Sequence, residues 1–469
     1  MNRHEEVFGR QQAYFWDKLK GSTATQRVAK LRKMKKWVLA HQKDIQAALF
    51  QDLHKPAHEA DLMEVLPVMA EIKDAIANLH DWMRPRRLPT PMAFIGSRSE
   101  VMYEPKGVSL ILAPWNFPYM LTIGPLVSAI AAGCTAMVKP SEFAPATSTL
   151  IEKMVTDLFP EEEVAVFHGY HTLATALTAM PFDHIFFTGS PEVGKKVMHA
   201  AAENLTSVTL ELGGRNPVIV DETANISDTA RKLVWGKLVN AGQSCMSPNY
   251  VLVHEKIYDQ LLKQIKSTYN KTYGEAAGHM QDSPYYSRLI TPRHQARLQE
   301  LVGTAVAAGA KVLIGGKGDT ATSYLDPTFL TDVELGNPIL EQELFGPILP
   351  FLKYKTLDEA LGIIRKIEKP LALYIFSRSN RNIERIMGST SSGSLMVNET
   401  TVAFGNTEMP FGGVNWSGIG KAHGHAGFLA FTNEKPVMRQ NTLVPFTLLA
   451  FAPYTKLKSK ALNLVMRLF

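Results

Sequence analysis

Among the residues of this sequence, Cys245 is the one whose type and setting most suggest covalent chemistry. It is one of only two cysteines in 469 residues. Gly242 gives the backbone freedom just before it, and Pro248 just after it cannot donate a backbone hydrogen bond, so we expect the thiol on a connection that a substrate can reach. Because a cysteine is also commonly a small buried apolar residue, this position alone leaves both a nucleophile and a core residue open.

Glu211 is the candidate base for such a nucleophile. In the run 207–217 apolar residues alternate with Thr209 and Glu211, as expected for an extended segment, and Gly213 and Gly214 follow. A carboxylate embedded in an apolar strand can have its pKa raised towards neutral pH, which suits a general base. A structural ion pair is the alternative interpretation.

The elements that must position these two residues follow the pattern of an α/β fold. Apolar residues recur at helical spacing over 5–83, which predicts several packed helices with a basic, solvated face rather than a binding patch. Strand, helix and strand then alternate twice, which predicts a doubly wound parallel sheet of the Rossmann type. The segments are 107–112, 121–132, 135–138, 164–167, 173–180 and 184–187.

The ends of two predicted strands carry candidate phosphate and ribose contacts. In 187–195, Gly189 and Gly194 lie between a strand and a helix, whose free amides favour phosphate oxygens. The full G-x-G-x-x-G pattern is absent, so an ordinary strand-to-helix turn remains equally open. Lys139 and Glu142 follow an earlier strand and could bind ribose hydroxyls or be surface charges.

A second α/β unit is predicted from Val218 onward. Its expected strands are 218–220, 250–253, 311–314 and 326–330, and its expected helices are 257–269 and 295–308. Two loops follow, one with acids and an aromatic residue over 341–350 and one dense in glycine over 409–420. The prolines of 84–99 mark a boundary between units.

Composition limits the class of protein. A chain of 469 residues that is 45% hydrophobic predicts two or three globular units with large cores. Two cysteines make no disulfide framework and the first ten residues contain no apolar run, so we expect a reducing, cytoplasmic setting. The formal charge of +6 is modest and indicates a solvated surface rather than a nucleic-acid site.

Seven segments together resemble the aldehyde dehydrogenase superfamily, in the order and spacing of that family. The chain is most similar to its class 3 branch, which includes fatty and aromatic aldehyde dehydrogenases, and the resemblance runs from about Glu5 to about Arg439. The segments are Pro114-Trp115-Asn116-Phe117-Pro118, 139–142, 187–194, Glu211-Leu212-Gly213-Gly214, Gly242-Gln243-Ser244-Cys245, Glu343-Leu344-Phe345-Gly346-Pro347 and Pro410-Phe411-Gly412-Gly413.

This resemblance implies catalytic roles for three residues. Cys245 would attack the aldehyde carbon, while the side-chain amide of Asn116 and the backbone N–H of Cys245 hold the oxyanion. After hydride transfer, Glu211 would activate the water that hydrolyses the thioester to a carboxylic acid. The alternative of a CoA-acylating relative is disfavoured by the presence of Glu211, and a non-catalytic scaffold protein would be free to lose these three residues.

The resemblance also implies NAD or NADP as cofactor. Lys139 and Glu142 would contact the adenosine ribose, Gly189 and Ser190 the pyrophosphate, and the remaining expected contacts are Trp115, Gly194, Leu212, Glu343 and Phe345, of which Glu343 and Phe345 would meet the nicotinamide ribose and ring. Because a carboxylate at Glu142 would repel a 2′-phosphate, NAD is favoured over NADP, although the branch includes users of both.

Domain boundaries and a homodimer follow from the same resemblance. Residues 1–83 and 102–210 would bind the cofactor, and 211–419 would form the catalytic domain. Residues 84–101 and 420–440 would form an oligomerisation arm, and 441–469 a basic, apolar tail.

The expected substrate is a medium or long aliphatic aldehyde or an aromatic one, because an apolar pocket is expected around Phe117, Tyr119, Met246 and Phe404. The chain departs from the family at Arg215, at Met246 and at the pair Asn415 and Trp416. Of these, Met246 and Trp416 bear on substrate choice. Cys134 is expected in the core. No metal site is predicted, and His423 and His425 are expected to be solvent-exposed in a loop.

The tail is basic and contains no acid. Its apolar run 443–454 is shorter than the roughly 20 residues of a spanning helix and contains two prolines, which argues against a transmembrane anchor. The basic amphipathic end, 456–469, could lie on an anionic membrane surface. The alternative is that it packs over the partner subunit or over its own substrate entrance.

Overall fold

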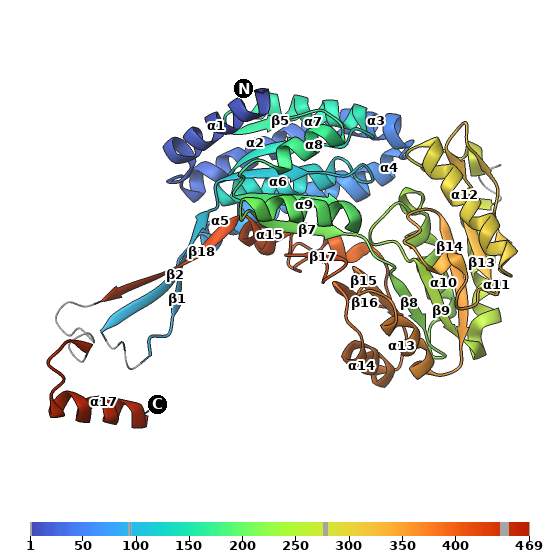
Figure 1. Cartoon of the computed structure of the whole chain (residues 1–469). Helices are drawn as coiled ribbons and strands as arrows, with labels where there is room; N and C mark the ends of the chain where they lie inside the picture. The colour runs from blue at the N-terminus through green and yellow to red at the C-terminus, as the bar shows by residue number, and fades with distance from the viewer. Residues whose placement is uncertain (1, 92–93, 95, 275–279, 441–449, 469) are drawn as a thin grey trace.

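The computed structural model describes residues 2–91, 94, 96–274, 280–440 and 450–468. Two α/β bodies lie side by side, and a narrow arm extends from one end of the first body (Figure 1). The architecture therefore agrees with the predicted pair of α/β units with a small β arm.

The first body is built on a six-stranded sheet with the order β17-β7-β6-β3-β4-β5. All neighbours are parallel except β17 and β7. Because β3 pairs with β4 on one side and β6 on the other, the strand order reverses between β3 and β6. The strands are β3 (Val108–Leu112), β4 (Thr135–Lys139), β5 (Val164–Val166), β6 (His184–Gly189), β7 (Ser207–Leu212) and β17 (Gly418–Ile419).

Helices connect these strands and cover the sheet. The apolar α6 (Met120–Ala132) ends at Gly133, whose φ of 85° is the left-handed conformation that glycine adopts freely. α9 begins after Ser190, whose side chain accepts a hydrogen bond from the Val193 amide. Besides α6, the connecting helices are α7 (Pro145–Leu158), α8 (His171–Thr178) and α9 (Pro191–Glu203).

The N-terminal segment forms a helical layer on this body, as the 3.6-residue periodicity predicts. The apolar faces of α2, α5 and α6 share one buried cluster. Two π-helical segments interrupt the layer, and their position is not visible in the apolar periodicity. The elements are α1 (Arg3–Tyr14), η1 (Phe15–Leu19), α2 (Ala24–Ala40), α3 (Gln42–Leu53), α4 (Ala57–Ala60), η2 (Asp61–Val65) and α5 (Leu66–Trp82).

The second body contains a seven-stranded sheet with the order β10-β13-β14-β9-β8-β15-β16. Only β10 is antiparallel to its neighbour. The central strands are buried on both faces, as expected for a parallel sheet between helices. The strands are β8 (Pro217–Val220), β9 (Tyr250–His254), β10 (Lys311–Ile314), β13 (Thr328–Thr331), β14 (Ile348–Tyr354), β15 (Ala372–Phe376) and β16 (Ser394–Val397).

Helices flank this second sheet, and short elements lie in the connections between its strands and helices. The longer helices are α10 (Ile226–Leu238), α11 (Tyr258–Tyr269), α12 (Pro292–Ala307), α13 (Leu357–Arg365) and α14 (Asn380–Ser389). The short elements are η4 (Val239–Gly242), η5 (Glu255–Ile257), η6 (Asn270–Gly274), η7 (Met280–Asp282), β11 (Gly318–Asp319), β12 (Tyr324–Leu325), η8 (Pro338–Leu340) and η9 (Val402–Gly405).

The arm is a three-stranded antiparallel sheet with the order β1-β2-β18. Its strands are β1 (Arg86–Leu88), β2 (Ser97–Pro105) and β18 (Thr432–Gln440). The sequence predicts an arm that includes all of 420–440, but the first part differs. Residues Gly424–Ala430 form helix α15, which packs on α5 and α6 within the first body.

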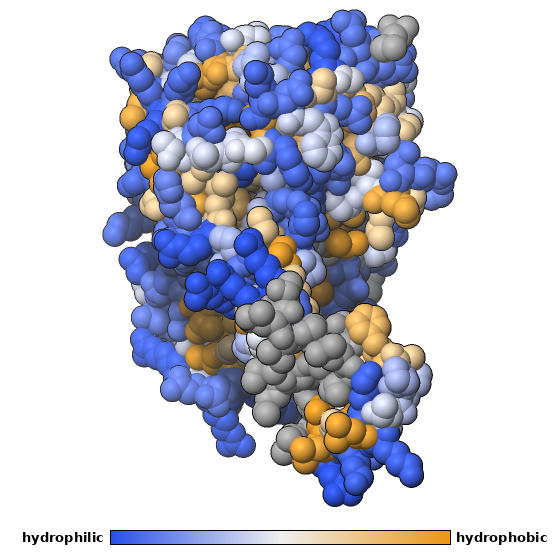
Figure 2. All heavy atoms as spheres, turned by 90° about the vertical axis from the view of Figure 1, so that its left-hand side faces the viewer, coloured by the Kyte–Doolittle hydropathy of each residue, from blue (hydrophilic) through white to orange (hydrophobic). Residues whose placement is uncertain are grey.

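Helix α17 (Lys456–Leu468) lies beyond the arm, away from both bodies (Figure 1). Figure 2 shows apolar and basic side chains of the tail next to one another at this end of the molecule. Among the described residues, no helix is both long enough and apolar enough to cross a bilayer.

Candidate active site

The two sheets meet at the short crossing from β7 to β8. β7 ends at Leu212, and β8 begins at Pro217, so the carboxyl edge of the first sheet faces the amino edge of the second. A cavity of about 230 Å³ lies at this junction, next to the reversal of strand order between β3 and β6, where open α/β sheets bind their ligands. It is lined by Pro114, Trp115, Asn116, Thr188, Gly189, Ser190, Glu211, Leu212, Gly213, Cys245, Glu343 and Phe345.

A second cavity, of about 40 Å³, opens on the other side of Cys245 and is mostly apolar. Thr188, Glu211, Leu212 and Cys245 line both cavities. The other lining residues come mainly from α5, α6 and the 411–423 segment: Pro67, Val68, Glu71, Met120, Leu121, Gly124, Pro125, Ser128, Phe186, Leu371, Phe411, Ala422 and His423. The thiol and the candidate base therefore lie where the two cavities meet.

The loop that carries Cys245 has an unusual backbone. Asn240, Ala241 and Gly242 all have positive φ, at 53°, 51° and 73°. A Cβ atom at Gly242 would lie 2.2 Å from the carbonyl oxygen of Gly346, so only glycine allows the two loops to approach so closely. The buried Asn216 side chain donates to the Cys245 carbonyl at 2.7 Å, and this contact was not visible in the sequence.

Asn116 lies on the loop after β3, and its side chain is only 3% exposed. Its Nδ2 donates to the Gln243 carbonyl at 3.1 Å, two residues before the thiol. Because an amide nitrogen carries two hydrogens, one remains for an acceptor in the cavity. The structure thus brings Asn116, Glu211 and Cys245, the three predicted catalytic residues, to one cavity.

Burial dominates the electrostatics of the site. It raises the pKa of Glu211 well above its usual range, and Lys421 only partly opposes this shift. No described residue donates a hydrogen bond to either carboxylate oxygen of Glu211, so the alternative of a structural ion pair is not what the structure contains. Burial, with smaller effects from Glu343 and Glu211, also raises the pKa of Cys245 to about 12, while the amides of Cys245 and Met246 lower it.

Glu343 and Phe345 face the same cavity from the second body. Burial raises the pKa of Glu343 to about 7, and its Oε1 has no partner among the described residues. The Phe345 backbone has φ of 51°, and its carbonyl lies 2.8 Å from His294 Nε2. Burial lowers the pKa of His294 to about 4, so this ring is neutral at pH 7 and can donate a hydrogen bond to Phe345.

Most of the expected cofactor contacts surround this cavity, but three lie outside its lining. Lys139 and Glu142 lie beside it at the end of β4, where they form an ion pair of 2.9 Å with each other. Gly194 packs against Leu212, and a Cβ atom there would lie 2.7 Å from the Leu212 side chain. Its glycine therefore serves close packing of α9 on β7.

The expected pocket aromatics and Met246 do not line the apolar cavity. Phe117, Tyr119 and Met246 are at most 4% exposed and pack into the cores, and Phe404 packs against the same cores from η9. The loop positions visible in the sequence do not show which way a side chain points. The cavity is lined instead by residues of α5 and α6, which the sequence pattern placed in helices but not in the pocket.

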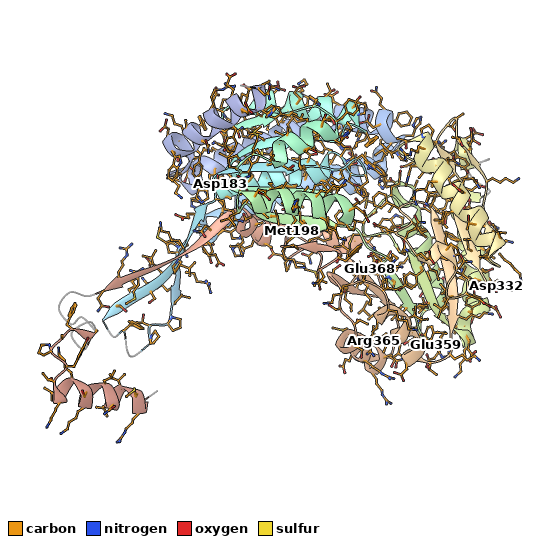
Figure 3. The ribbon with its side chains drawn as sticks, viewed as in Figure 1. Asp183, Met198, Asp332, Glu359, Arg365 and Glu368 are labelled. Carbon is orange, nitrogen blue, oxygen red and sulfur yellow. The ribbon has the colours of Figure 1, made fainter. Side chains whose placement is uncertain are left out.

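His423 differs from its expectation, and Arg215 has a structural contact. The sequence predicts that His423 and His425 are exposed, which is wrong for His423, because its side chain is 12% exposed and its Nδ1 lies 2.5 Å from the buried Glu71. Arg215 pairs with Glu368, labelled in Figure 3, and donates to the Leu340 carbonyl at 2.8 Å. It therefore secures the loop before Glu343.

Comparison with known proteins identifies the family. The model of the "Aldehyde dehydrogenase family" matches residues 10–437. The chain belongs to the aldehyde dehydrogenase family. It is an NAD(P)-dependent aldehyde dehydrogenase, an oxidoreductase that oxidises aldehydes to acids.

Individual relatives of this aldehyde dehydrogenase include members of the class 3 branch. The 4,4'-diaponeurosporen-aldehyde dehydrogenase of Staphylococcus aureus is 38% identical over 94% of this chain and 95% of its own length. Aldehyde dehydrogenase family 3 member A2 of Mus musculus is 39% identical over 88% and 84%. The solved substrate-bound state of Staphylococcus aureus AldH has a TM-score of 0.94 and 37% identity, covering 99% of this chain and 100% of that one.

Proposed function

We propose that Cys245 is the nucleophile of this aldehyde dehydrogenase and that Asn116 and the Cys245 amide hold the oxyanion. The Cys245 thiolate adds to the aldehyde carbon, so that a C–S bond forms and the carbonyl oxygen becomes negative. The free N–H of Asn116 stabilises this charge. A nicotinamide cofactor held by residues such as Glu343 and Phe345 would supply the acceptor for the hydride of this carbon, and Cys245 would then hold the acyl group as a thioester.

Glu211 completes the reaction as general base. Its carboxylate removes a proton from a water molecule, whose oxygen attacks the thioester carbon. The C–S bond breaks, the carboxylic acid leaves and Cys245 returns as thiolate. The same base can deprotonate the thiol at the start of the cycle. One observation carries this proposal: Cys245 and Glu211 both line the first cavity and the second cavity.

The first cavity fits a nicotinamide cofactor. One buried oxygen of Glu343 has no partner among the described residues, and a Cβ atom at Gly213 would lie 2.0 Å from that carboxylate, so glycine lets the carboxylate lie there. Lys139, Glu142, Trp115, Gly189, Ser190, Leu212, Glu343 and Phe345 would hold the cofactor. We favour NAD, because Glu142 would repel a 2′-phosphate. Equal kcat/KM for NAD and NADP would contradict this preference.

The proposed substrate is a medium or long aliphatic aldehyde or an aromatic one. Apolar side chains from α5 and α6 line the approach to Cys245. The polyene aldehyde in the name of the Staphylococcus aureus relative supports an apolar substrate class. A CoA-acylating reaction is the second candidate by family analogy, but Glu211 favours hydrolysis.

NADH formation at 340 nm tests this proposal. Purified protein is supplied with NAD or NADP and aldehydes from short to long chain plus benzaldehyde, next to Cys245→Ala. We expect kcat/KM to rise with chain length and activity to disappear in Cys245→Ala. Activity that survives this substitution would overturn the mechanism, and activity that requires CoA would replace hydrolysis by acyl transfer.

We also propose that the arm joins two subunits in a homodimer. Residues 1–83 and 102–210 would form the cofactor-binding domain, and 211–419 the catalytic domain. β18 is an edge strand with mostly exposed residues, and unprotected edges tend to be covered. Met198 on α9, labelled in Figure 3, is 48% exposed and offers a further apolar contact. If light scattering at micromolar concentration gave the molar mass of a monomer, it would contradict this proposal.

The tail helix α17 is proposed to bind an anionic membrane surface. Three of its four basic residues, Lys456, Lys460 and Arg467, lie along one face at helical spacing, with the exposed Leu457 and Leu464 beside them, and Lys458 lies on the opposite side. No acidic residue follows Gln440 in the chain. Such a helix would hold the enzyme at the surface in which a long aldehyde dissolves.

A further inference from the structure

Lys55 and Glu64 form an ion pair in which both side chains are completely buried. Lys55 follows α3 and Glu64 lies in η2, so both come from the N-terminal helical layer, which supplies none of the proposed catalytic residues. Burying two charges carries a large desolvation cost that only good geometry and further hydrogen bonds can offset. The further partners of this pair lead to the proposed oxyanion residue.

Glu64 holds the first turn of α6. Its Oε2 accepts hydrogen bonds from the backbone amides of Tyr119 and Met120, at 2.9 and 3.1 Å. These amides have no partner within the helix, and a negative charge is favourable at this end of it. Asn116 lies three residues before Tyr119, so the Glu64 carboxylate fixes the position of the backbone that follows Asn116.

Lys55 contacts Asn116 directly. Its Nζ donates to the Asn116 carbonyl at 3.3 Å and lies 4.5 Å from the centre of the Phe117 ring. The same carbonyl accepts a hydrogen bond of 2.7 Å from Asn240 Nδ2. Asn240 Nδ2 also donates to the Gln243 carbonyl at 3.0 Å, which is the acceptor of the Asn116 side chain. The backbone of Asn116 is thus held between the ion pair and the loop of the thiol.

We propose that Lys55 and Glu64 are positioning residues for the oxyanion amide of Asn116. This inference rests on the proposed role of Asn116. The ion pair fixes the carbonyl and the following turn, so that the side-chain amide keeps its direction towards the Cys245 loop. Because a displacement of about 1 Å can cost about 10²-fold in rate, a pair that never touches the substrate can still affect catalysis.

A double-mutant cycle with Asn116→Ala tests the inference. We expect Lys55→Met to lower kcat about tenfold, less than the roughly 10²–10³-fold expected for complete loss of an oxyanion donor, and to leave the Kd for NAD unchanged. In the Asn116→Ala background the same substitution should change kcat by less than about twofold, because the amide it positions is gone. Rates are expressed per thiol that iodoacetamide titrates in the folded fraction from gel filtration, in which Cys134 is buried and Cys245 is partly exposed. Misfolded chains, which expose both thiols, are removed in that step.

Glu64→Gln provides a second variant that keeps the size of the side chain. It removes the charge from the amides of Tyr119 and Met120, and we expect the same dependence on Asn116. Lys55→Arg, which keeps the charge, should recover part of the kcat lost in Lys55→Met.

Arg27→Met is the matched control, because Arg27 caps the other end of the same helix. It is 4% exposed and donates to the Ala131 carbonyl at 3.0 Å and to the Ala132 carbonyl. We expect it to lower thermal stability as Lys55→Met does, while kcat per titrated thiol stays at the wild-type value.

The outcomes separate the two proposals. If Asn116→Ala keeps the wild-type kcat, the role of Asn116 fails, and this inference fails with it. If Asn116→Ala is impaired but Lys55→Met and Glu64→Gln keep the wild-type kcat, or lower it equally in both backgrounds, only the positioning role is overturned.

Discussion

Glu211 carries a carboxyl group that is 6% exposed and has no hydrogen-bond donor among the described residues. An isolated carboxylate is expensive to bury, so the protonated form is favoured in the folded protein. The raised pKa is useful to a base that must later release its proton. The same shift makes Glu211 a source of instability at higher pH.

The pH dependence of folding tests this cost. Because the pKa of Glu211 is higher in the folded protein than in the unfolded chain, its contribution to stability is fully present below about pH 4 and is lost as the pH rises through the folded value. We therefore expect Glu211→Gln to raise the unfolding temperature at pH 8 and to change it little near pH 4. Glu300→Gln, on the exposed side of α12, is the control. A lower unfolding temperature for Glu211→Gln at pH 8 would contradict the prediction.

Turnover tests the chemical role of the same residue. Glu211→Gln cannot accept a proton from water, so hydrolysis of the thioester should slow by about 10²–10⁴-fold. If another group or solvent deprotonates Cys245, the thioester still forms, and stopped-flow absorbance should show one NADH per site before a slow steady state. Loss of the burst together with turnover would mean that Glu211 acts before hydride transfer. A wild-type steady-state rate would exclude it as the base.

The contacts between distant residues are what the sequence could not supply. Alternation around Glu211 and the glycine before Cys245 made a base and a reachable thiol candidates, and the resemblance to the aldehyde dehydrogenases implied their roles. The hydrogen bond of Asn216 to the Cys245 carbonyl, the contact of Lys55 with Asn116 and that of His294 with Phe345 each join segments at least 29 residues apart. Periodicity reports that a side chain is buried, not which partner it meets.

At the scale of elements, the site depends on loops that approach closely at glycine. Gly242 brings the thiol loop against Gly346, which follows Phe345. The sequence predicted β3 to β10 and β13, but it missed β14 and β15, although both are buried apolar runs of the kind typical of parallel sheets. It did not separate α15 from the arm, since both lie in one short stretch after the glycine-dense loop.

Substitution of Gly242 tests this approach. Gly242→Ala adds a Cβ atom 2.2 Å from a backbone oxygen at a φ of 73°, so the loops must separate. We expect a loss of about 1–3 kcal/mol in the free energy of unfolding and a larger loss of kcat than of cofactor affinity. Gly303→Ala, in α12 with no atom within 4 Å of the added carbon, should instead stabilise by about 0.5–1 kcal/mol. Urea unfolding and steady-state kinetics of both variants provide the comparison. A Gly242→Ala variant with the wild-type free energy of unfolding and kcat would contradict the prediction.

At the scale of the whole molecule, the arm and tail lie outside the two bodies that form the active site. The arm sheet leaves the first body at one end, and α17 lies near its tip (Figure 1). Removing the tail should therefore leave the cavities around Cys245 intact. A truncation of the tail can therefore distinguish its two proposed roles. Membrane binding would be lost without a change in catalysis, whereas packing over the substrate entrance would affect catalysis.

Truncation after Thr455 removes α17 and the basic residues Lys456, Lys458, Lys460 and Arg467. Each basic residue near an anionic surface contributes about 1 kcal/mol, and the exposed leucines add apolar burial. We expect the full chain to sediment with vesicles containing phosphatidylserine and to be released at high salt, while the truncated chain stays in the supernatant. Both should oxidise a short water-soluble aldehyde at equal kcat, but only the full chain should gain activity towards a long aldehyde dissolved in those vesicles. If the full chain does not sediment with anionic vesicles, or if the truncation changes kcat for the short aldehyde, packing of the tail on the protein would be favoured.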